Sequence, residues 1–194
     1  MSFRVEEKLL IDRKQILEFK NFLFKKKAQE VFPARKIKSL YFENFKEEMY
    51  SDSLEGIVPR KKIRVRNYPD KKDLALYLEI KISSAEGRYK VRNLIDKDKF
   101  NNLKKIGLYD NQYGACRPLV YVIYNREYYQ IGDVRISIDE NIEYFLFSGR
   151  ELGQDNNSVV ELKTNINKNR DDLLNNFPFQ RTRFSKYCNA FEKI

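Results

Sequence analysis

Apolar and polar residues alternate along much of the chain, and this two-residue period predicts β-strands. The expected strands are residues 3–11, 37–43, 61–68, 75–83, 88–95, 119–129, 134–147 and 158–165. Between them, apolar spacing of three to four residues predicts helices over 13–27, 96–106, 169–176 and 184–194. The sequence therefore predicts an α+β fold in which strands dominate.

Turn and capping residues mark several boundaries of these elements. Asp12 and Asp96 are suited to cap the first two helices, and Gly107 is suited to end the second. Phe32-Pro33 predicts a break in the chain before the second strand. The acidic stretch that follows this strand, through Gly56, predicts no regular element.

The polar faces of the expected strands are ionic rather than simply hydrophilic. They carry eleven basic residues, Arg4, Lys8, Arg64, Arg66, Lys81, Arg88, Lys90, Arg92, Arg126, Arg135 and Lys163, and four acidic ones, Glu6, Glu79, Asp139 and Glu161. The opposite faces are apolar, as in Ile63-Val65 and Ile136-Ile138. A solvated sheet face explains one such strand, but seven strands with this pattern favour a closed antiparallel β-barrel with helices packed outside and a charged lumen.

Composition limits the classes of function that are open to the chain. The 194 residues predict a single domain, 1–194, and the net charge of +10 predicts an anionic partner. The absence of histidine excludes His-based catalysis, and two distant cysteines exclude a disulfide framework. The longest apolar run, 119–124, is too short to span a membrane, and the N-terminus lacks a signal peptide, so a cytoplasmic protein is expected.

The mixture of arginines with a few carboxylates on these faces favours phosphate as the ligand. Arginine binds phosphate oxygens through two parallel hydrogen bonds. Mg²⁺ and Mn²⁺ bind carboxylate and phosphate oxygens, and they need neither histidine nor cysteine. We therefore expect a cluster or chain of phosphates with Mn²⁺ or Mg²⁺ among them.

An ordered series of short motifs resembles a known family. The motifs are Arg4-x-Glu6-x-Lys8, Ser39-Leu40-Tyr41-Phe42, Lys62-Ile63-Arg64-Val65-Arg66-Asn67-Tyr68, Leu78-Glu79-Ile80-Lys81, Tyr124-Asn125-Arg126, residues 134–139, Val160-Glu161-Leu162-Lys163 and residues 183–187. Together they resemble the vacuolar transporter chaperone (VTC) domain, the polyphosphate polymerase-like branch of the triphosphate tunnel metalloenzyme (CYTH-like) superfamily.

The resemblance implies a barrel that encloses a centre for ATP-driven polyphosphate synthesis. It implies phosphate-binding roles for Lys8, Arg64, Arg66, Lys81, Lys90, Arg126, Arg135, Lys163, Ser185 and Lys186, of which Arg64, Arg66, Lys81 and Arg126 would be catalytic. Glu161 and Glu6 would hold Mn²⁺ or Mg²⁺. The hydrolytic branch has Glu-x-Glu-x-Lys on its first strand, so Arg4 at the first of these positions favours the polymerase-like branch.

Other functions and roles stay open at this stage. The same residues would serve a triphosphatase or NTPase, or a sensor that binds polyphosphate or a nucleotide without turnover. Nucleic acid is not expected as a partner, because no recognition-helix, zinc or RNP signature is present. The partners are then ATP, polyphosphate or triphosphate, with a membrane-bound partner protein left open.

Several residues have a purely structural interpretation. Glu79 is suited equally to ion pairing and to metal binding. Tyr41, Tyr68 and Tyr124 are expected to pack rather than to touch substrate. The runs 25–27 and 60–62 are expected to be solvated basic surface.

Overall fold

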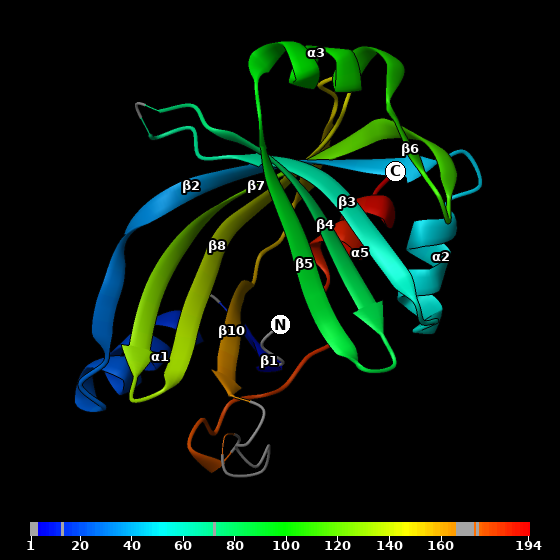
Figure 1. The fold of residues 1–194 in the computed structure, drawn as a ribbon. Coiled ribbons are helices and arrows are strands. Elements are labelled where there is room, and N and C mark those ends of the chain that lie inside the picture. The colour runs from blue at the N-terminus through cyan, green and yellow to red at the C-terminus, as the bar shows by residue number, and fades with distance from the viewer. Residues whose placement is uncertain (1–3, 13, 72, 166–172, 174) are drawn as a thin grey trace. The chain divides into compact units, whose positions relative to one another are not determined.

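A computed structural model describes residues 4–12, 14–71, 73–165, 173 and 175–194. The strands are β1 (Arg4–Ile11), β2 (Gln29–Asn44), β3 (Arg60–Asn67), β4 (Leu76–Ser84), β5 (Gly87–Ile95), β6 (Leu108–Asp110), β7 (Gly114–Ile131), β8 (Val134–Leu146), β9 (Glu151–Gln154) and β10 (Ser158–Asn165). The helices are α1 (Gln15–Lys25), α2 (Glu48–Glu55), α3 (Lys97–Ile106) and α5 (Lys186–Phe191) (Figure 1). The expected helix over 169–176 lies largely outside the described residues.

The strands form one sheet in the order β1-β10-β8-β7-β2-β3-β4-β5, with β6 paired to β7 and β9 paired to β8. The pairs β1–β10, β10–β8, β2–β3, β3–β4, β4–β5 and β6–β7 are antiparallel. The expected closed barrel is not observed, because no pairing among the described residues joins the two ends of this order, β1 and β5. Most β5 residues are exposed on both faces, as expected for an edge strand.

Most expected elements are confirmed, and the exceptions have local causes. Asp96 caps α3 by accepting a hydrogen bond from Lys99 N, and the helix ends at Gly107 with φ +81°. The expected break at Phe32-Pro33 is wrong: β2 continues through both residues, in a stretch that is exposed and therefore tolerates a missing ladder donor. Helix α2 lies in the stretch for which no element was expected.

The chain divides into two compact units, one of residues 1–36, 124–142 and 154–184, the other of residues 37–123, 143–153 and 185–194. We call them unit 1 and unit 2 and describe each by itself. The strands β2, β7 and β8 each contribute residues to both units.

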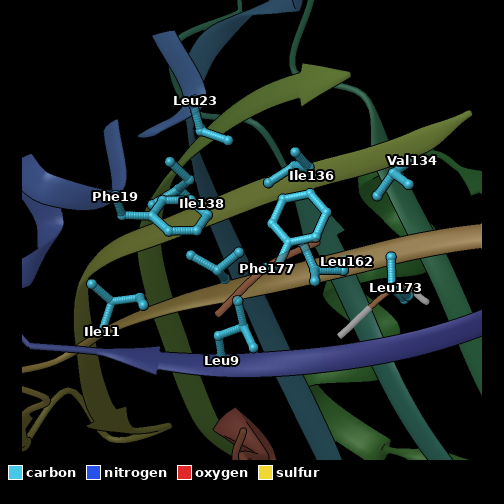
Figure 2. Packing of buried hydrophobic residues seen from close by; sticks show 11 residues of the cluster. Leu9, Ile11, Phe19, Leu23, Val134, Ile136, Ile138, Leu162, Leu173 and Phe177 are labelled. Carbon is cyan, nitrogen blue, oxygen red and sulfur yellow. The ribbon is translucent and has the colours of Figure 1, made fainter. Parts of the chain in front are cut away.

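The core of unit 1 forms where the apolar faces of its strands meet helix α1. Phe19 and Leu23 of α1 lie over apolar side chains of β1, β8 and β10, such as Leu9, Ile138 and Leu162 (Figure 2). Phe177 and Phe179 extend the cluster by edge-to-face contacts with the rings of α1. The apolar face of the strand pattern is thus covered by a helix, which leaves the ionic face on the other side of the strands.

In unit 2, buried side chains of β2, β3, α2 and α5 form the core. Helix α2 contacts both β3 and α5. The Glu43 carboxylate is buried among them, where it accepts hydrogen bonds from the backbone N–H groups of Met49 and Tyr50 and from the Tyr187 hydroxyl. This carboxylate therefore joins the first turn of α2 to α5.

Candidate functional site

The ionic face of unit 2 is organised in rows, because β2, β3, β4 and β5 pair in register. One row contains Tyr41, Arg64, Glu79 and Arg92. The row on one side of it contains Lys62, Lys81 and Lys90, and the row on the other side contains Ser39, Arg66, Tyr77 and Leu94. Rows two residues apart lie about 7 Å apart along the strands.

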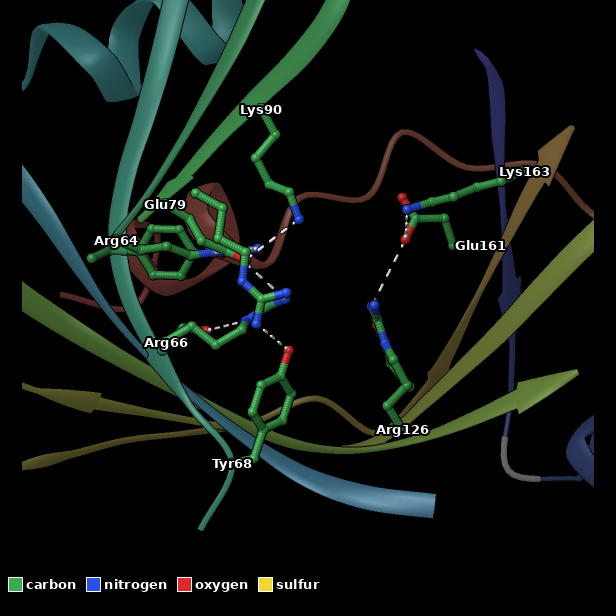
Figure 3. Close-up of polar contacts among 12 residues, drawn as sticks. Arg64, Arg66, Tyr68, Glu79, Lys90, Arg126, Glu161 and Lys163 are labelled. Atoms are coloured by element: carbon green, nitrogen blue, oxygen red, sulfur yellow. Dashed lines mark hydrogen bonds and ion pairs between the residues drawn. The ribbon is translucent and has the colours of Figure 1, made fainter. Parts of the chain in front are cut away.

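Glu79 lies at the centre of a cluster of cations, which we call the Glu79 cluster: Glu79, Arg64, Arg66, Lys90 and Arg92. Figure 3 shows Glu79 with Arg64, Arg66 and Lys90. Arg64 donates from Nε and Nη2 to one carboxylate oxygen, at 2.9 and 2.6 Å. Lys90 Nζ and Arg92 Nε lie 3.4 and 3.5 Å from the other oxygen. The cluster thus contains four positive side chains and one negative one.

The electrostatics of the Glu79 cluster follow from this composition. Burial would raise the pKa of Glu79, but Arg64, Arg66 and Lys90 hold it well below its usual range. Burial lowers the pKa of Lys90, and Arg64 and Arg66 add to this effect against the opposing Glu79 carboxylate. Glu79 is therefore ionised at neutral pH and balances the charge of these cations. Of the two roles that the sequence left open, ion pairing and metal binding, the structure shows ion pairing.

Tyr41 and Lys62 lie beside the Glu79 cluster on the same face, and the cations of the cluster alter the pKa of Tyr41. Arg64 Nη1 donates to the Tyr41 hydroxyl at 2.8 Å. Burial raises the pKa of Tyr41, but the charges of Arg64 and Arg66 outweigh it, and the net shift is downward. Lys62 is half-buried, and its Nζ lies 2.8 Å from Ser185 Oγ, so the expectation that 60–62 is solvated surface is wrong for it. Burial also lowers the pKa of Lys62.

Lys61, the preceding residue of that run, is partly buried and forms an ion pair. Its Nζ lies 2.9 and 2.8 Å from the two carboxylate oxygens of Asp110. Lys62, by contrast, shares the face of Arg64 and Arg66. Its position two residues before Arg64 is the signal in the sequence that could have assigned it to the site.

The second group of ionic residues belongs to unit 1 and is centred on Glu161. We call it the Glu161 cluster: Glu161, Glu6, Lys163, Arg126 and Asp139. Lys163 Nζ lies 3.5 Å from a carboxylate oxygen of Glu161 and 3.5 Å from one of Glu6. Arg126 Nη2 lies 3.8 Å from Glu161 (Figure 3) and donates to Asp139 at 2.6 Å.

This second cluster contains more carboxylates than cations. Asp139 is 1% exposed, and Arg126 is held against it by two parallel hydrogen bonds. Burial lowers the pKa of Arg126, but Asp139 and Tyr124 raise it far more, so this guanidinium is permanently charged. Asp139 was not among the expected site residues, although its alternation with Arg135 and Ser137 placed it on the ionic face.

The donor set of the Glu161 cluster suits a hard divalent cation. Glu6 and Glu161 converge on one positive group, the Lys163 ammonium, and both offer the carboxylate oxygens that Mg²⁺ and Mn²⁺ prefer. Among the described residues, no group of three or more acidic or cysteine side chains is arranged to hold a metal ion. Phosphate oxygens would therefore have to complete the coordination.

The remaining expected site residues lie on the same strands or at α5. In unit 1, Lys8 pairs with Glu161 in register and donates to the carbonyl of Phe184 at 2.6 Å, and Arg135 is exposed opposite Lys163. In unit 2, Lys81 is exposed between Lys62 and Lys90.

Ser185 and Lys186 stand at the start of helix α5 in unit 2. The Ser185 hydroxyl caps the helix by accepting from Cys188 N at 3.2 Å, and Lys186 is its first residue. Ser185 therefore combines the capping role with the contact to Lys62 described above.

Several solved structures have folds similar to this one. A proposed adenylate cyclase from Bacillus halodurans superposes with a TM-score of 0.66 at 10% identity, covering 98% of this chain and 97% of that one. A proposed adenylyl cyclase from Hippeastrum, described as having a dominant triphosphatase activity, gives 0.63 at 13% identity, covering 99% and 96%. A conserved hypothetical protein from Pyrococcus furiosus gives 0.61 at 17% identity, covering 95% and 99%. The fold is that of the CYTH-like triphosphate tunnel proteins.

The family follows from the sequence itself. The profile of the VTC domain matches residues 3–194, so the chain belongs to the VTC domain family, as the ordered motifs predicted. No curated protein matches the sequence. Within the described residues, no helix is both long and apolar enough to cross a membrane.

Proposed function

We propose that the whole chain, residues 1–194, acts as one VTC-type domain that transfers phosphoryl groups from a nucleoside triphosphate, with ATP-driven polyphosphate synthesis as the reaction. The observation that carries the proposal is the ionic face of unit 2. Six basic side chains, Lys62, Arg64, Arg66, Lys81, Lys90 and Arg92, share that face with Glu79, and four of them, Arg64, Arg66, Lys90 and Arg92, form ion pairs with its carboxylate. Such a surplus of positive charge on a partly buried face is stabilised when an anion binds.

In this reaction the bond between the β,γ-bridging oxygen and the γ-phosphorus of ATP breaks, and ADP leaves. A terminal oxygen of phosphate or of a polyphosphate chain forms the new P–O bond. Phosphoryl transfer needs alignment and charge stabilisation rather than a covalent nucleophile. Arg64 and Arg66 are buried and held by Glu79, so they would bind phosphate oxygens without reorganising.

Mn²⁺ or Mg²⁺ would be held by Glu161, with Glu6 as the second ligand. When bound, such an ion would polarise the phosphoryl group being transferred. The Lys163 ammonium lies between these two carboxylates and would balance their negative charge until substrate arrives. Arg126 is kept ionised by Asp139 and would bind phosphate oxygens, as would Lys8 and Arg135.

Two alternatives use the same residues. Water in place of the phosphate acceptor would give a triphosphatase or NTPase, and the described activity of the Hippeastrum protein, a structural relative, favours keeping this possibility. Binding without turnover would give a sensor of polyphosphate or nucleotide.

Product analysis distinguishes the three. Purified protein is incubated with ATP and Mn²⁺, and polyphosphate, inorganic phosphate and ADP are resolved. The proposal expects polyphosphate with one ADP formed for each phosphate added to a chain. Phosphate and ADP without polymer would establish hydrolysis instead. Tight binding of polyphosphate with no product from ATP would establish a sensor.

A further inference from the structure

The ionic face of unit 2 changes in character along its strands. The row of Lys62, Lys81 and Lys90 is purely cationic. The next row contains Arg64, and the row after that contains Arg66. Tyr68 lies two residues beyond Arg66, just past the end of β3. The face therefore passes from lysines through arginines to aromatic and apolar side chains.

The aromatic end of this face is a small platform made of Tyr68, Tyr77, Arg92 and Leu94. The Tyr68 and Tyr77 rings meet edge to face at 6.3 Å. The Arg92 guanidinium lies 3.6 Å from the centroid of the Tyr77 ring. Its Nη2 atom donates to the Tyr68 hydroxyl at 3.4 Å. Leu94 pairs with Tyr77 in register and is 69% exposed. The sequence predicted packing for Tyr68, and its ring does pack against Tyr77, at the end of the charged face beyond Arg66.

We propose that this platform, Tyr68, Tyr77, Arg92 and Leu94, binds the nucleobase of a nucleoside triphosphate whose phosphates lie on the Glu79 cluster. The inference rests on the proposed function and adds to it a site for the base of the nucleotide donor. Bases stack on tyrosine rings and on guanidinium planes, and an exposed leucine adds apolar surface beside them. An inorganic chain offers nothing for such a surface to bind.

The register gives the orientation of the nucleotide. Arg66 and Tyr77 are direct cross-strand neighbours, so their side chains lie side by side, with Cβ atoms about 5 Å apart. Arg64 and Glu79 follow one row further, and the lysine row follows after that. The α-phosphate would therefore lie nearest Arg66, and the β- and γ-phosphates would extend toward Arg64, Lys90 and Lys81. The Arg92 guanidinium covers one face of the Tyr77 ring, at 3.6 Å from its centroid. The base would therefore stack on Arg92, which the Tyr77 ring holds in place, and against Leu94.

The test compares ATP with inorganic triphosphate, which lacks the base and the ribose. Affinities for ATP and for inorganic triphosphate are measured by calorimetry at matched free Mg²⁺, for the wild-type protein and for Tyr77→Leu, Tyr77→Phe and Leu94→Ser. Tyr89→Leu is the matched control, because Tyr89 is a partly exposed tyrosine of β5 that pairs with Ile82 on the opposite face.

The inference expects Tyr77→Leu and Leu94→Ser to weaken ATP binding about five- to tenfold, which corresponds to about 1 kcal/mol or slightly more, the value of one stacked base. Inorganic triphosphate should bind these variants as it binds the wild type, and Tyr77→Phe and Tyr89→Leu should leave both ligands unchanged. Equal losses for the two ligands, or no loss for either, would overturn the platform while leaving the proposed function intact. A wild-type protein that binds neither ligand would overturn both.

Discussion

Arg64 donates two hydrogen bonds to a single oxygen of Glu79, and the second oxygen of that carboxylate is left to Lys90 and Arg92. One carboxylate thus orders cations from β3 and from β5. This arrangement fixes Arg64 in place while Lys90 and Arg92, which are more exposed, keep access to a ligand. Preorganised cations of this kind are what phosphoryl transfer requires of a protein.

Glu79→Gln should destabilise the protein by about 3 kcal/mol, because removing one partner of a buried ion pair leaves the others uncompensated. Inorganic triphosphate should restore much of this loss by supplying the missing negative charge. Urea unfolding with and without triphosphate measures both effects. If triphosphate stabilises the wild type and Glu79→Gln equally, the carboxylate does not compete with phosphate for these cations.

Acid stability provides a second test of the same carboxylate. The pKa of Glu79 lies below its ordinary value of 4.5, so the folded state binds fewer protons than the unfolded state. Its contribution to stability is complete above pH 4.5 and is lost as the pH falls below that value. The free energy of unfolding of the wild type should therefore decline more steeply than that of Glu79→Gln between about pH 4.5 and 2. Parallel declines would contradict the assignment.

Tyr187→Phe should destabilise unit 2 by about 1–3 kcal/mol, because it leaves the buried Glu43 carboxylate with one donor fewer. Burial raises the pKa of Glu43 despite its hydrogen bonds, so this group opposes folding increasingly as the pH rises through that pKa. The penalty of Tyr187→Phe should consequently shrink in acid, where Glu43 is protonated. Urea unfolding at several pH values measures it. A penalty that does not change with pH would show that the contact is not charge-assisted.

Lys81→Ala should weaken inorganic triphosphate binding about tenfold, or about 1.4 kcal/mol, without altering stability. The Lys81 side chain is exposed, so its loss leaves no cavity, and it lies in the row of cations between Lys62 and Lys90. Lys105→Ala is the matched control, since Lys105 is an exposed lysine in the last turn of α3. Calorimetry measures the affinity of both variants for inorganic triphosphate. Equal affinities of Lys81→Ala and Lys105→Ala would show that Lys81 does not belong to the site.

Triphosphate binding should weaken at alkaline pH, below the ordinary lysine value of 10.5, because the pKa of Lys90 is lowered and the side chain loses its charge as the pH rises through it. Lys90→Arg keeps the charge at every accessible pH. Its affinity should therefore fall less steeply than that of the wild type as the pH rises toward 10.5. Identical pH profiles would show that the lowered pKa of Lys90 plays no part in binding.

The sequence predicts the local structure of this protein better than its tertiary contacts. Strand alternation placed Arg64, Arg66 and Glu79 on one face, and capping residues located α3 from Asp96 to Gly107. Both signals are local in the chain. Helix α2 was missed because its first turn is capped by Glu43, a buried side chain that also depends on Tyr187 from the far end of the chain.

The same limit applies to the arrangement of the candidate site residues. The pairing of Lys62 with Ser185, and the buried Arg126–Asp139 pair, depend on contacts between distant segments that periodicity does not specify. The aromatic platform was missed for the same reason: Tyr77 pairs with Leu94 only once the register of β4 and β5 is known. Closure of the barrel was expected from the ionic faces and from the family resemblance, but closure requires edge pairing, which alternation does not encode.

The most direct test of the account separates chemistry from binding in one variant, Glu161→Gln. ATP consumption is followed with Mn²⁺ present, and the affinity for inorganic triphosphate is measured on the same preparations, for this variant and the wild type. The account predicts a rate at least about a hundredfold lower, comparable to the loss of one major stabilising group, with triphosphate affinity within about twofold of the wild type. A Glu161→Gln protein that consumes ATP at the wild-type rate would contradict it.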